Sequence, residues 1–458
     1  MNRVVKVAAL GAACVALSAC STLSNLNPFN RDKGPQAIAS KGERIPVLTY
    51  DQSVTASESL AGIDYLIPDP QPVTAWPLPG GNAEQAMENM AAGSAFQVAW
   101  KKGVGDGSNR KRQVTAPPVA LDGRIFTMDG DADVTASDAK SGAQVWKTSV
   151  RAESKRDKEG FGGGLAVANG KVFVTSGYRV VAALDAASGK VLWRKTVESP
   201  IHAAPTAANG RIYAVDIDNQ IIAFDQETGD QTWSYQALVE SARILRASSP
   251  AVSGDAVIAP FSSGELIALR TANGNLLWNE SLSRTSRTNA LSEIRDIPGR
   301  PAVYRGDVYA VSQSGLMAAV DLRTGNSRWQ LPVSSVNSPW PAGDAVFVLS
   351  KAGELVAVNR DSGQVYWVVD LNEGRKGRKE GGFLKMGGRE VRPIWTGPVL
   401  ADNRLVVVNN WGEAVALNAK TGAREKSLKI GKGAYIAPIA YDGMLYVVTD
   451  DAELVAIR

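Results

Sequence analysis

The sequence ASDAKSGAQVW, residues 136–146, decides the fold, because the same phrase returns along most of the chain. Its recurring features are a leading alanine, a polar residue two positions later, a glycine and a final tryptophan. Self-similarity with a period of about 40–45 residues is typical of the blades of a β-propeller. Further copies end at Trp193, Trp233, Trp278, Trp329 and Trp367, and a seventh copy has Lys426 in the place of the tryptophan.

The middle of the phrase predicts a tight hairpin turn. The Asp138 side chain is suited to accept backbone N–H groups two or three residues further on, and Gly142 supplies the positive φ that closes such a loop. Ala136 and Trp146 then face each other across the hairpin, and the small alanine leaves room for the indole to lie against the next blade. We therefore interpret the tryptophans as packing between blades and not as a cofactor site. The residues given this structural role are Trp100, Trp146, Trp193, Trp233, Trp278, Trp329 and Trp367.

The two ends of the repeat region complete each other. The last copy stops after three expected strands, two residues beyond Ala456, and the stretch FQVAWKK at 96–102 places Trp100 in the tryptophan position. Pairing these ends removes two free sheet edges. The sequence thus predicts an all-β fold over residues 96–458: an eight-bladed β-propeller with four-stranded antiparallel blades, closed by the N-terminal strand in the last blade. Because Lys426 interrupts the pattern, we expect the seventh blade to be the least tightly packed.

Residues 1–19 have the features of a lipoprotein signal peptide. A short basic start precedes an apolar run over 7–19 that is too short to cross a bilayer comfortably. The run ends in the lipobox LSAC, so we expect Cys20 to carry the lipid. Ser21 lacks the acidic character that favours retention in the inner membrane. The expected location is the outer membrane, anchored by lipid and facing the periplasm.

Residues 20–95 are expected to form a lipidated tether followed by a proline-rich extension. The segment 67–81, IPDPQPVTAWPLPGG, favours an extended, polyproline-like chain. Two interpretations remain open: a linker that lies across the propeller, or a proline-rich ligand for another protein.

Composition narrows the functional classes. The 50 basic and 46 acidic residues nearly balance, which does not favour a nucleic-acid binder. The two cysteines are Cys14, in the signal peptide, and Cys20, so residues 21–458 have no thiol. The one histidine, His202, is expected to be a packed or surface residue. We predict no catalytic residue, metal ligand or cofactor.

Departures from the repeat mark the expected contact sites, because the frame itself is fixed by packing. Two spacings are long and hold the insertions 281–297 and 372–392, of which the second is rich in basic residues. Ile244 and Leu245 are apolar residues in a connection that is otherwise polar. They either tuck under the ring or contact another protein together with Arg246.

The phrase is similar to the repeat of quinoprotein dehydrogenases, but those enzymes use adjacent cysteines that residues 21–458 lack. The lipobox, tether, proline-rich entry and eight blades together resemble the BamB family, outer membrane lipoproteins of the β-barrel assembly machinery. This resemblance implies a non-enzymatic scaffold that docks on the POTRA domains of BamA, works with other machinery components and helps nascent outer membrane proteins to fold and insert. The partner-binding residues it implies are Leu245, Arg246, Glu293 and Asp296, beside Ile244.

One family position departs in this chain, because a second acidic residue of the family falls on Pro298. Two other functions stay open at this level. One is a quinoprotein-like dehydrogenase, and the other is a periplasmic propeller that binds a small ligand in its central funnel.

Overall fold

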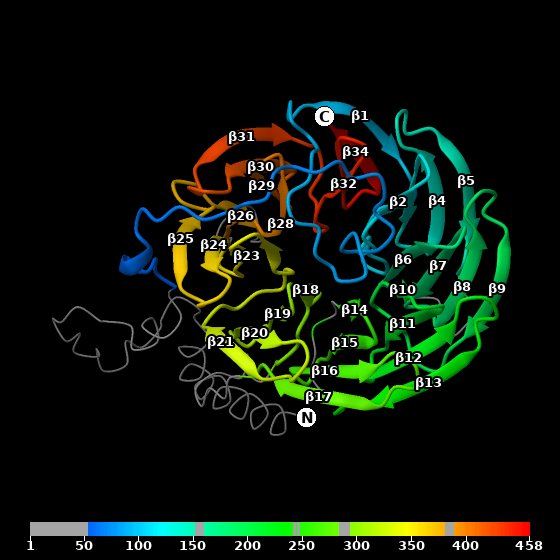
Figure 1. Cartoon of the computed structure of the whole chain (residues 1–458). Coiled ribbons are helices and arrows are strands. Elements are labelled where there is room, and N and C mark those ends of the chain that lie inside the picture. Colours follow the sequence, from blue (N-terminus) through cyan, green and yellow to red (C-terminus); the bar gives the residue numbers. More distant parts are fainter. Residues whose placement is uncertain (1–53, 152–159, 241–243, 245–247, 284–293, 381–388) are drawn as a thin grey trace, which may run out of the picture. The chain divides into compact units, whose positions relative to one another are not determined.

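The computed structural model describes residues 54–151, 160–240, 244, 248–283, 294–380 and 389–458. Within this part, eight four-stranded antiparallel sheets surround a common centre (Figure 1). The predicted all-β, eight-bladed propeller is therefore confirmed, including its closure. Strand β1, from the N-terminal side, pairs with β34 at the C-terminus, and Trp100 lies opposite Ala456.

Every blade has the same strand order from the inside of the ring to the outside. Blades 1 and 2 consist of β2 (Val119–Leu121), β3 (Arg124–Met128), β4 (Asp133–Asp138) and β5 (Gln144–Ser149), then β6 (Gly163–Ala168), β7 (Lys171–Ser176), β8 (Val180–Asp185) and β9 (Val191–Thr196). Blades 3 and 4 consist of β10 (Thr206–Ala208), β11 (Arg211–Val215), β12 (Gln220–Asp225) and β13 (Gln231–Gln236), then β14 (Ala251–Ser253), β15 (Ala256–Pro260), β16 (Glu265–Arg270) and β17 (Leu276–Ser281).

The second half of the ring repeats this order. Blades 5 and 6 consist of β18 (Ala302–Tyr304), β19 (Asp307–Val311), β20 (Met317–Asp321) and β21 (Ser327–Leu331), then β22 (Trp340–Ala342), β23 (Ala345–Leu349), β24 (Glu354–Asn359) and β25 (Val365–Asp370). Blades 7 and 8 consist of β28 (Trp395–Ala401), β29 (Arg404–Asn409), β30 (Glu413–Asn418) and β31 (Arg424–Lys429), then β32 (Ile439–Tyr441), β33 (Met444–Val448), β34 (Glu453–Ile457) and β1 (Val98–Gly103). Outside the blades lie the hairpin β26 (Arg378–Glu380) and β27 (Arg389–Val391) and the short 3-10 helix η2 (Glu58–Leu60).

In most blades the repeated alanine lies between two large aromatic residues on the neighbouring strands. In blade 3, Ala223 lies between Tyr213 on β11 and Trp233 on β13, and the two rings meet over it with centroids 5.8 Å apart. The same alanine–tryptophan register occurs at Ala136 and Trp146. A larger side chain in the middle strand would separate the rings, so the alanine is a packing requirement.

Each indole lies on the phrase glycine of the next blade. A Cβ added to Gly274 in blade 4 would be 2.6 Å from Cε3 of Trp233 in blade 3, and Gly274 has a φ of +73°. The Nε1–H of Trp233 donates to the carbonyl oxygen of Thr271 at 2.9 Å. The glycine therefore serves both the turn and the neighbour's indole, which lies between the blades at Trp100, Trp146, Trp193, Trp233, Trp278, Trp329 and Trp367.

Lys426 replaces the tryptophan because blade 8 offers nothing for an indole to lie on. The outer strand of blade 8 is β1, so the chain has no hairpin turn between its third and fourth strands. Residues 93–96 lie there, with Phe96 buried, and Lys426 Nζ donates to the carbonyl oxygens of Ser94 and Ala95 at 3.0 and 3.4 Å. This segment occupies the place that a hairpin turn has in the other blades, and the looser packing of blade 7 stays a prediction.

The antiparallel order gives the ring two different faces. One face carries the connections between blades and the turn between the second and third strand of each blade, and we call it the connection face. The other carries the two remaining hairpin turns of each blade, or the one remaining turn of blade 8, and we call it the turn face. Backbone hydrogen bonds join the loops of each face, as from Gln313 N to Asp296 O (2.8 Å) on the connection face and from Thr271 N to Asp255 O (2.8 Å) on the turn face.

Candidate functional site

Two connections that are distant in sequence meet on the connection face. The connection from blade 3 to blade 4 follows β13, and the connection from blade 4 to blade 5 precedes β18. The backbone N–H of Ile244 in the first donates to Oδ2 of Asp296 in the second at 3.0 Å. Two of the residues that the sequence suggested for partner binding are thus in direct contact.

Asp296 is an interior residue, with only 4% of its surface exposed. Its neighbour Ile297 is buried in the core between blades 4 and 5, and Ile297 N donates to Phe261 O at 3.3 Å. The Asp296 carboxylate therefore holds the Ile244 backbone from inside the loop layer. A buried carboxylate that accepts a backbone N–H fixes the position of nearby surface residues, but it is not itself part of the surface that a partner contacts. Leu245, Arg246, Glu293 and Cys20 lie outside the described residues.

An exposed apolar pair lies in the same connection as Ile244 and was missed by the sequence reasoning. Leu238 and Val239 are each 66% exposed, directly after the buried Ala237. The Leu238 backbone is fixed on both sides, because its N–H donates to Oε2 of Glu265 (3.2 Å) and its carbonyl accepts from Nδ2 of Asn219 (2.5 Å). The signal in the sequence was the apolar pair in a polar connection, the same signal that singled out Ile244.

The Glu265 carboxylate that supports this pair is itself well bonded. It accepts hydrogen bonds from Oγ of Ser263 at 2.8 Å and from Nδ2 of Asn279 at 2.9 Å, besides the Leu238 N–H. Because both ends of the peptide around Leu238 are held, the exposed side chains project from an ordered backbone. We call Leu238, Val239 and Ile244, supported by Asp296, the docking surface.

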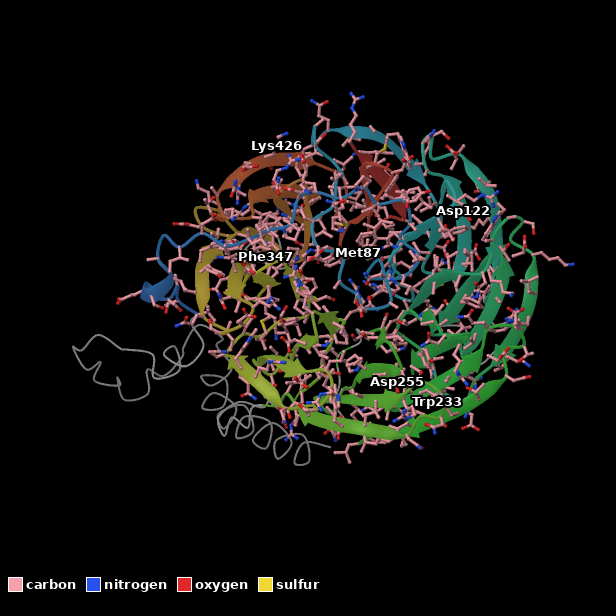
Figure 2. All side chains as sticks on the ribbon, in the orientation of Figure 1. Met87, Asp122, Trp233, Asp255, Phe347 and Lys426 are labelled. Carbon is pink, nitrogen blue, oxygen red and sulfur yellow. The ribbon has the colours of Figure 1, made fainter. Side chains whose placement is uncertain are left out.

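The segment 54–95, which we call the strap, crosses the opening of the ring on the side of the turn face. In Figure 1 it is the blue and light blue chain that passes over the centre, and Figure 2 places Met87 there. Backbone hydrogen bonds join the strap to the innermost strands and to the turns beside them. Bonds of 2.7 to 2.8 Å run from Ala120 N to Trp76 O, from Val167 N to Pro77 O, from Val252 N to Ala83 O and from Val303 N to Glu84 O.

Proline explains why three of the innermost strands offer the strap only one backbone N–H donor each. Pro118, Pro250 and Pro301 stand two residues before Ala120, Val252 and Val303, on the same edge of their strands. Proline has no N–H, so that edge has no further donor toward the connection face. The strap therefore crosses the ring close to the turn face, where each of these three strands presents its one backbone N–H.

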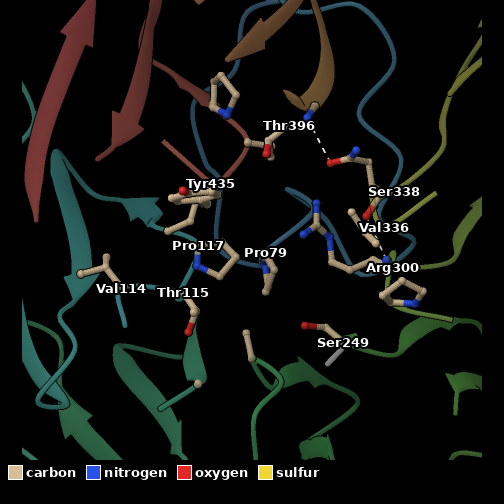
Figure 3. A pocket seen from close by; sticks show the side chains of 18 of the residues that line it. Pro79, Val114, Thr115, Pro117, Ser249, Arg300, Val336, Ser338, Thr396 and Tyr435 are labelled. Carbon is tan, nitrogen blue, oxygen red and sulfur yellow. Dashed lines mark hydrogen bonds between the residues drawn. The ribbon is translucent and has the colours of Figure 1, made fainter. Parts of the chain in front are cut away.

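Between the strap and the connection face, the centre of the ring holds a cavity of about 620 Å³. The strap residues Trp76 and Pro79 contribute to its lining, and most of the other described lining residues come from the starts of the innermost strands and from the loops before them. The Trp76 ring stacks near Trp340 with centroids 6.5 Å apart. Figure 3 shows Arg300, Tyr435 and Thr396 around this space.

His202 also lines the cavity, with its ring centroid 4.5 Å from that of Phe161. Among the described residues, no group of three or more His, Cys, Asp or Glu side chains is placed to hold a metal ion. In the same part of the chain, no helix has both the length and the apolar character needed to cross a membrane.

The basic insertion 372–392 contains the β26–β27 hairpin. At its base, Arg375 pairs with Glu413 at 2.6 Å, and the Arg378 guanidinium lies 4.2 Å from the centre of the Trp411 ring. These two basic residues are held against blade 7; the tip, 381–388, lies outside the described residues.

Comparison with known proteins gives one family. The family model described as outer membrane protein assembly factor BamB matches residues 97–158, 130–369 and 369–458. The protein of that name from Burkholderia pseudomallei is 28% identical over 341 residues, covering 69% of this chain and 86% of its own. The one from Shewanella oneidensis is 24% identical and covers 79% and 88%.

Solved structures agree on the fold. The crystal structure of BamB from Moraxella catarrhalis has a TM-score of 0.65 at 19% identity, covering 79% of this chain and 99% of its own. A quinohemoprotein alcohol dehydrogenase from Pseudomonas putida has a TM-score of 0.63 at 14% identity, covering 82% and 75%. Two kinds of protein therefore share this architecture, and the fold alone does not separate them.

Proposed function

The chain belongs to the family of outer membrane protein assembly factor BamB, and on this premise we propose that it is a non-enzymatic scaffold for outer membrane protein assembly. The relatives carry that name, which gives the general role. We further propose that it docks on the POTRA domains of BamA through the docking surface on its connection face. Nascent outer membrane proteins and other machinery components are its proposed further partners.

The observation that carries this proposal is the contact between Ile244 and Asp296. It makes one surface from two connections, and it does so beside an exposed apolar pair on a fixed backbone. Apolar anchors on a pre-ordered backbone are what a stable protein contact needs, because little conformational entropy is lost on binding. Leu245 and Arg246 follow Ile244 directly in the sequence and are the proposed continuation of the surface.

The anchor belongs to the same proposal. The lipobox ending at Cys20 supports attachment to the outer membrane by lipid, and residues 21–53 are long enough in sequence to serve as a tether. The non-enzymatic role is supported by the family and by the absence of cysteine from residues 21–458. The dehydrogenase alternative is supported by the shared propeller fold, but by none of the described residues discussed above.

The docking proposal is tested by co-purification of BamA from envelopes solubilised in mild detergent. The variant Leu238→Ser with Val239→Ser should lose most of the bound BamA, because truncating buried interface anchors costs about 2 kcal/mol or more, roughly thirtyfold in affinity. Leu276→Ser with Leu277→Ser is the matched control, since that pair is also exposed but lies on the outer strand β17. Equal BamA recovery in both variants would contradict the docking surface.

A second variant extends the test into the neighbouring residues. Leu245→Ala with Arg246→Glu should also abolish co-purification while the melting temperature stays near that of the parent chain. Full retention of the complex by this variant would remove Leu245 and Arg246 from the proposed contact.

A further inference from the structure

We propose that the central cavity is a binding site for a small organic anion with a flat apolar body. The cavity of about 620 Å³ falls within the roughly 300–1,000 Å³ of typical small-molecule sites. It is separate from the docking surface, so the inference does not rest on BamA binding. Three features of the cavity carry it: a floor from the strap, walls of flat side chains, and the guanidinium of Arg300.

The floor comes from a segment outside the family pattern. The family match begins at residue 97, whereas Trp76 and Pro79 belong to the strap. Trp76 is 1% exposed and is bonded through its backbone to Ala120 in both directions. Its Nε1–H has no hydrogen-bond acceptor among the described residues. That atom is itself buried, so Trp76 closes the floor by packing and donates no hydrogen bond to a ligand.

The walls present flat surfaces. Pro117, Pro298 and Pro398 contribute rings from blades 1, 5 and 7, and Trp340 and Tyr435 contribute aromatic rings from blades 6 and 8. Flat apolar ligands pack well on such faces. Hydroxyl and amide groups of Ser249, Thr396 and Asn337 lie among them and are suited to orient a polar substituent.

The charge selection comes from Arg300, the only lysine or arginine among the described residues that line the cavity. Its backbone is fixed, because Arg300 N donates to Oγ of Ser338 at 2.9 Å. The preceding Gly299 lies so close to the next blade that a Cβ there would be 2.3 Å from the carbonyl oxygen of Asn337. Figure 3 shows the Arg300 side chain extending from this base toward the cavity.

A guanidinium on a fixed base suits a carboxylate or sulfonate, since its planar fork donates two parallel hydrogen bonds. Among the described residues of the lining, Asp450 is the one acidic residue. It belongs to the turn between β33 and β34 in blade 8, whereas Arg300 precedes blade 5. The acid and the arginine thus come from different sides of the ring. The site therefore favours a ligand with its anion at the Arg300 side and its apolar body over the floor.

The test uses 1-naphthalenesulfonate as the probe and the full chain in nonionic detergent, with titration calorimetry and a detergent blank. We expect saturable binding of one probe per chain. Arg300→Gln should weaken it about tenfold, the loss expected for a charge-assisted hydrogen bond. Thr115→Trp, at an exposed position of the cavity lining, should also weaken it by filling the space. The neutral analogue 1-naphthalenemethanol should bind more weakly than the anion.

Arg323→Gln is the matched control, because Arg323 is an exposed arginine on the turn face of blade 5. It should leave probe affinity unchanged. The absence of saturable binding would overturn the proposal. So would binding that neither Arg300→Gln nor Thr115→Trp weakens, or equal affinity for the neutral analogue. A thermal melt of each variant confirms folding, and Thr115→Trp keeps the test decisive if Arg300→Gln does not fold.

Discussion

The backbone N–H of Ile244 donates a hydrogen bond to the buried carboxylate of Asp296, 52 positions further along the chain. This single bond ties the connection after blade 3 to the connection before blade 5. Both connections depart from the repeat, so neither is fixed by the packing that all blades share. The bond gives the two irregular segments a defined relative position, and it makes Asp296 a positioning residue for the proposed docking surface.

The nature of this bond can be tested by two substitutions. Asp296→Ala removes the acceptor and should strongly reduce recovery of BamA, whereas Asp296→Asn keeps an acceptor oxygen and should retain most of it. The measurement is co-purification from envelopes, with a thermal melt to show that both variants are folded. If Asp296→Asn fails as completely as Asp296→Ala, the negative charge is required, and a purely positioning role is wrong.

The interlock between blades predicts different costs for two glycines in one blade. Gly274 and Gly254 both have positive φ, so alanine costs about 1–2 kcal/mol at either position. At Gly274 the new Cβ would also meet Trp233, which adds about 1–3 kcal/mol of overpacking. A Cβ at Gly254 would meet no described residue within 4 Å other than its chain neighbours. Urea unfolding of Gly274→Ala and Gly254→Ala measures the difference. Equal midpoints would mean that the indole contact does not contribute.

The regular part of this fold was predictable because one local rule repeats. The phrase contains its own turn, with the Asp138 side chain accepting from Ser141 N at 2.8 Å and Gly142 at positive φ. Hydrogen bonds from Ser141 hold the pKa of the Asp138 carboxyl below its usual value. Because residues close together in the sequence form this turn, it could be predicted. The closing strand and the alanine–tryptophan pairs could be predicted as well.

The departures were harder to predict because they depend on contacts between distant segments. The partners of Lys426, the carbonyl oxygens of Ser94 and Ala95, lie outside the repeat and could not be predicted from it. Tyr65 of the strap shows the same limitation: its hydroxyl accepts from Trp367 Nε1 at 3.0 Å and donates to Ala419 O at 2.5 Å, bridging blades 6 and 7. No periodicity marks these residues, so the sequence did not predict their partners.

For the docking surface, the sequence indicated the right connections but not the role of each side chain. Ile244 and Asp296 were both selected, and they do touch. An acidic residue in an insertion was expected to face a partner, yet the Asp296 carboxylate accepts a backbone N–H inside the loop layer. Burial within an irregular loop depends on its tertiary neighbours, which composition does not reveal. The more exposed pair, Leu238 and Val239, was passed over.

Restoring the repeat at position 426 should not stabilise the protein. Replacing a residue by the one found in the other repeats often raises stability. Here Lys426→Trp would bring an indole against residues 93–96, where Arg404 donates to the carbonyl oxygens of Gly93 and Ser94 at 3.1 Å. We expect a loss of about 1–3 kcal/mol from overpacking.

Lys426→Met is the control for that substitution, because it keeps an unbranched chain and removes only the contacts to Ser94 and Ala95. It should cost about 0.5–1.5 kcal/mol. The midpoints of urea unfolding, measured for both variants and the parent chain, give the stability differences. A Lys426→Trp chain more stable than the parent would show that the gap between blades 7 and 8 does accept an indole.

The strap should contribute to the stability of the ring as well as to the floor of the cavity. Trp76 is fully buried, is paired with Ala120 through two backbone hydrogen bonds and lies near Trp340. Trp76→Ala should therefore lower the free energy of unfolding by about 3–5 kcal/mol, the usual loss for a buried tryptophan. Ile63→Ala in the same segment removes a 53% exposed side chain and should change it by less than about 0.5 kcal/mol. Urea unfolding monitored by circular dichroism tests both, and similar midpoints for the two variants would show that the strap lies on the ring without stabilising it.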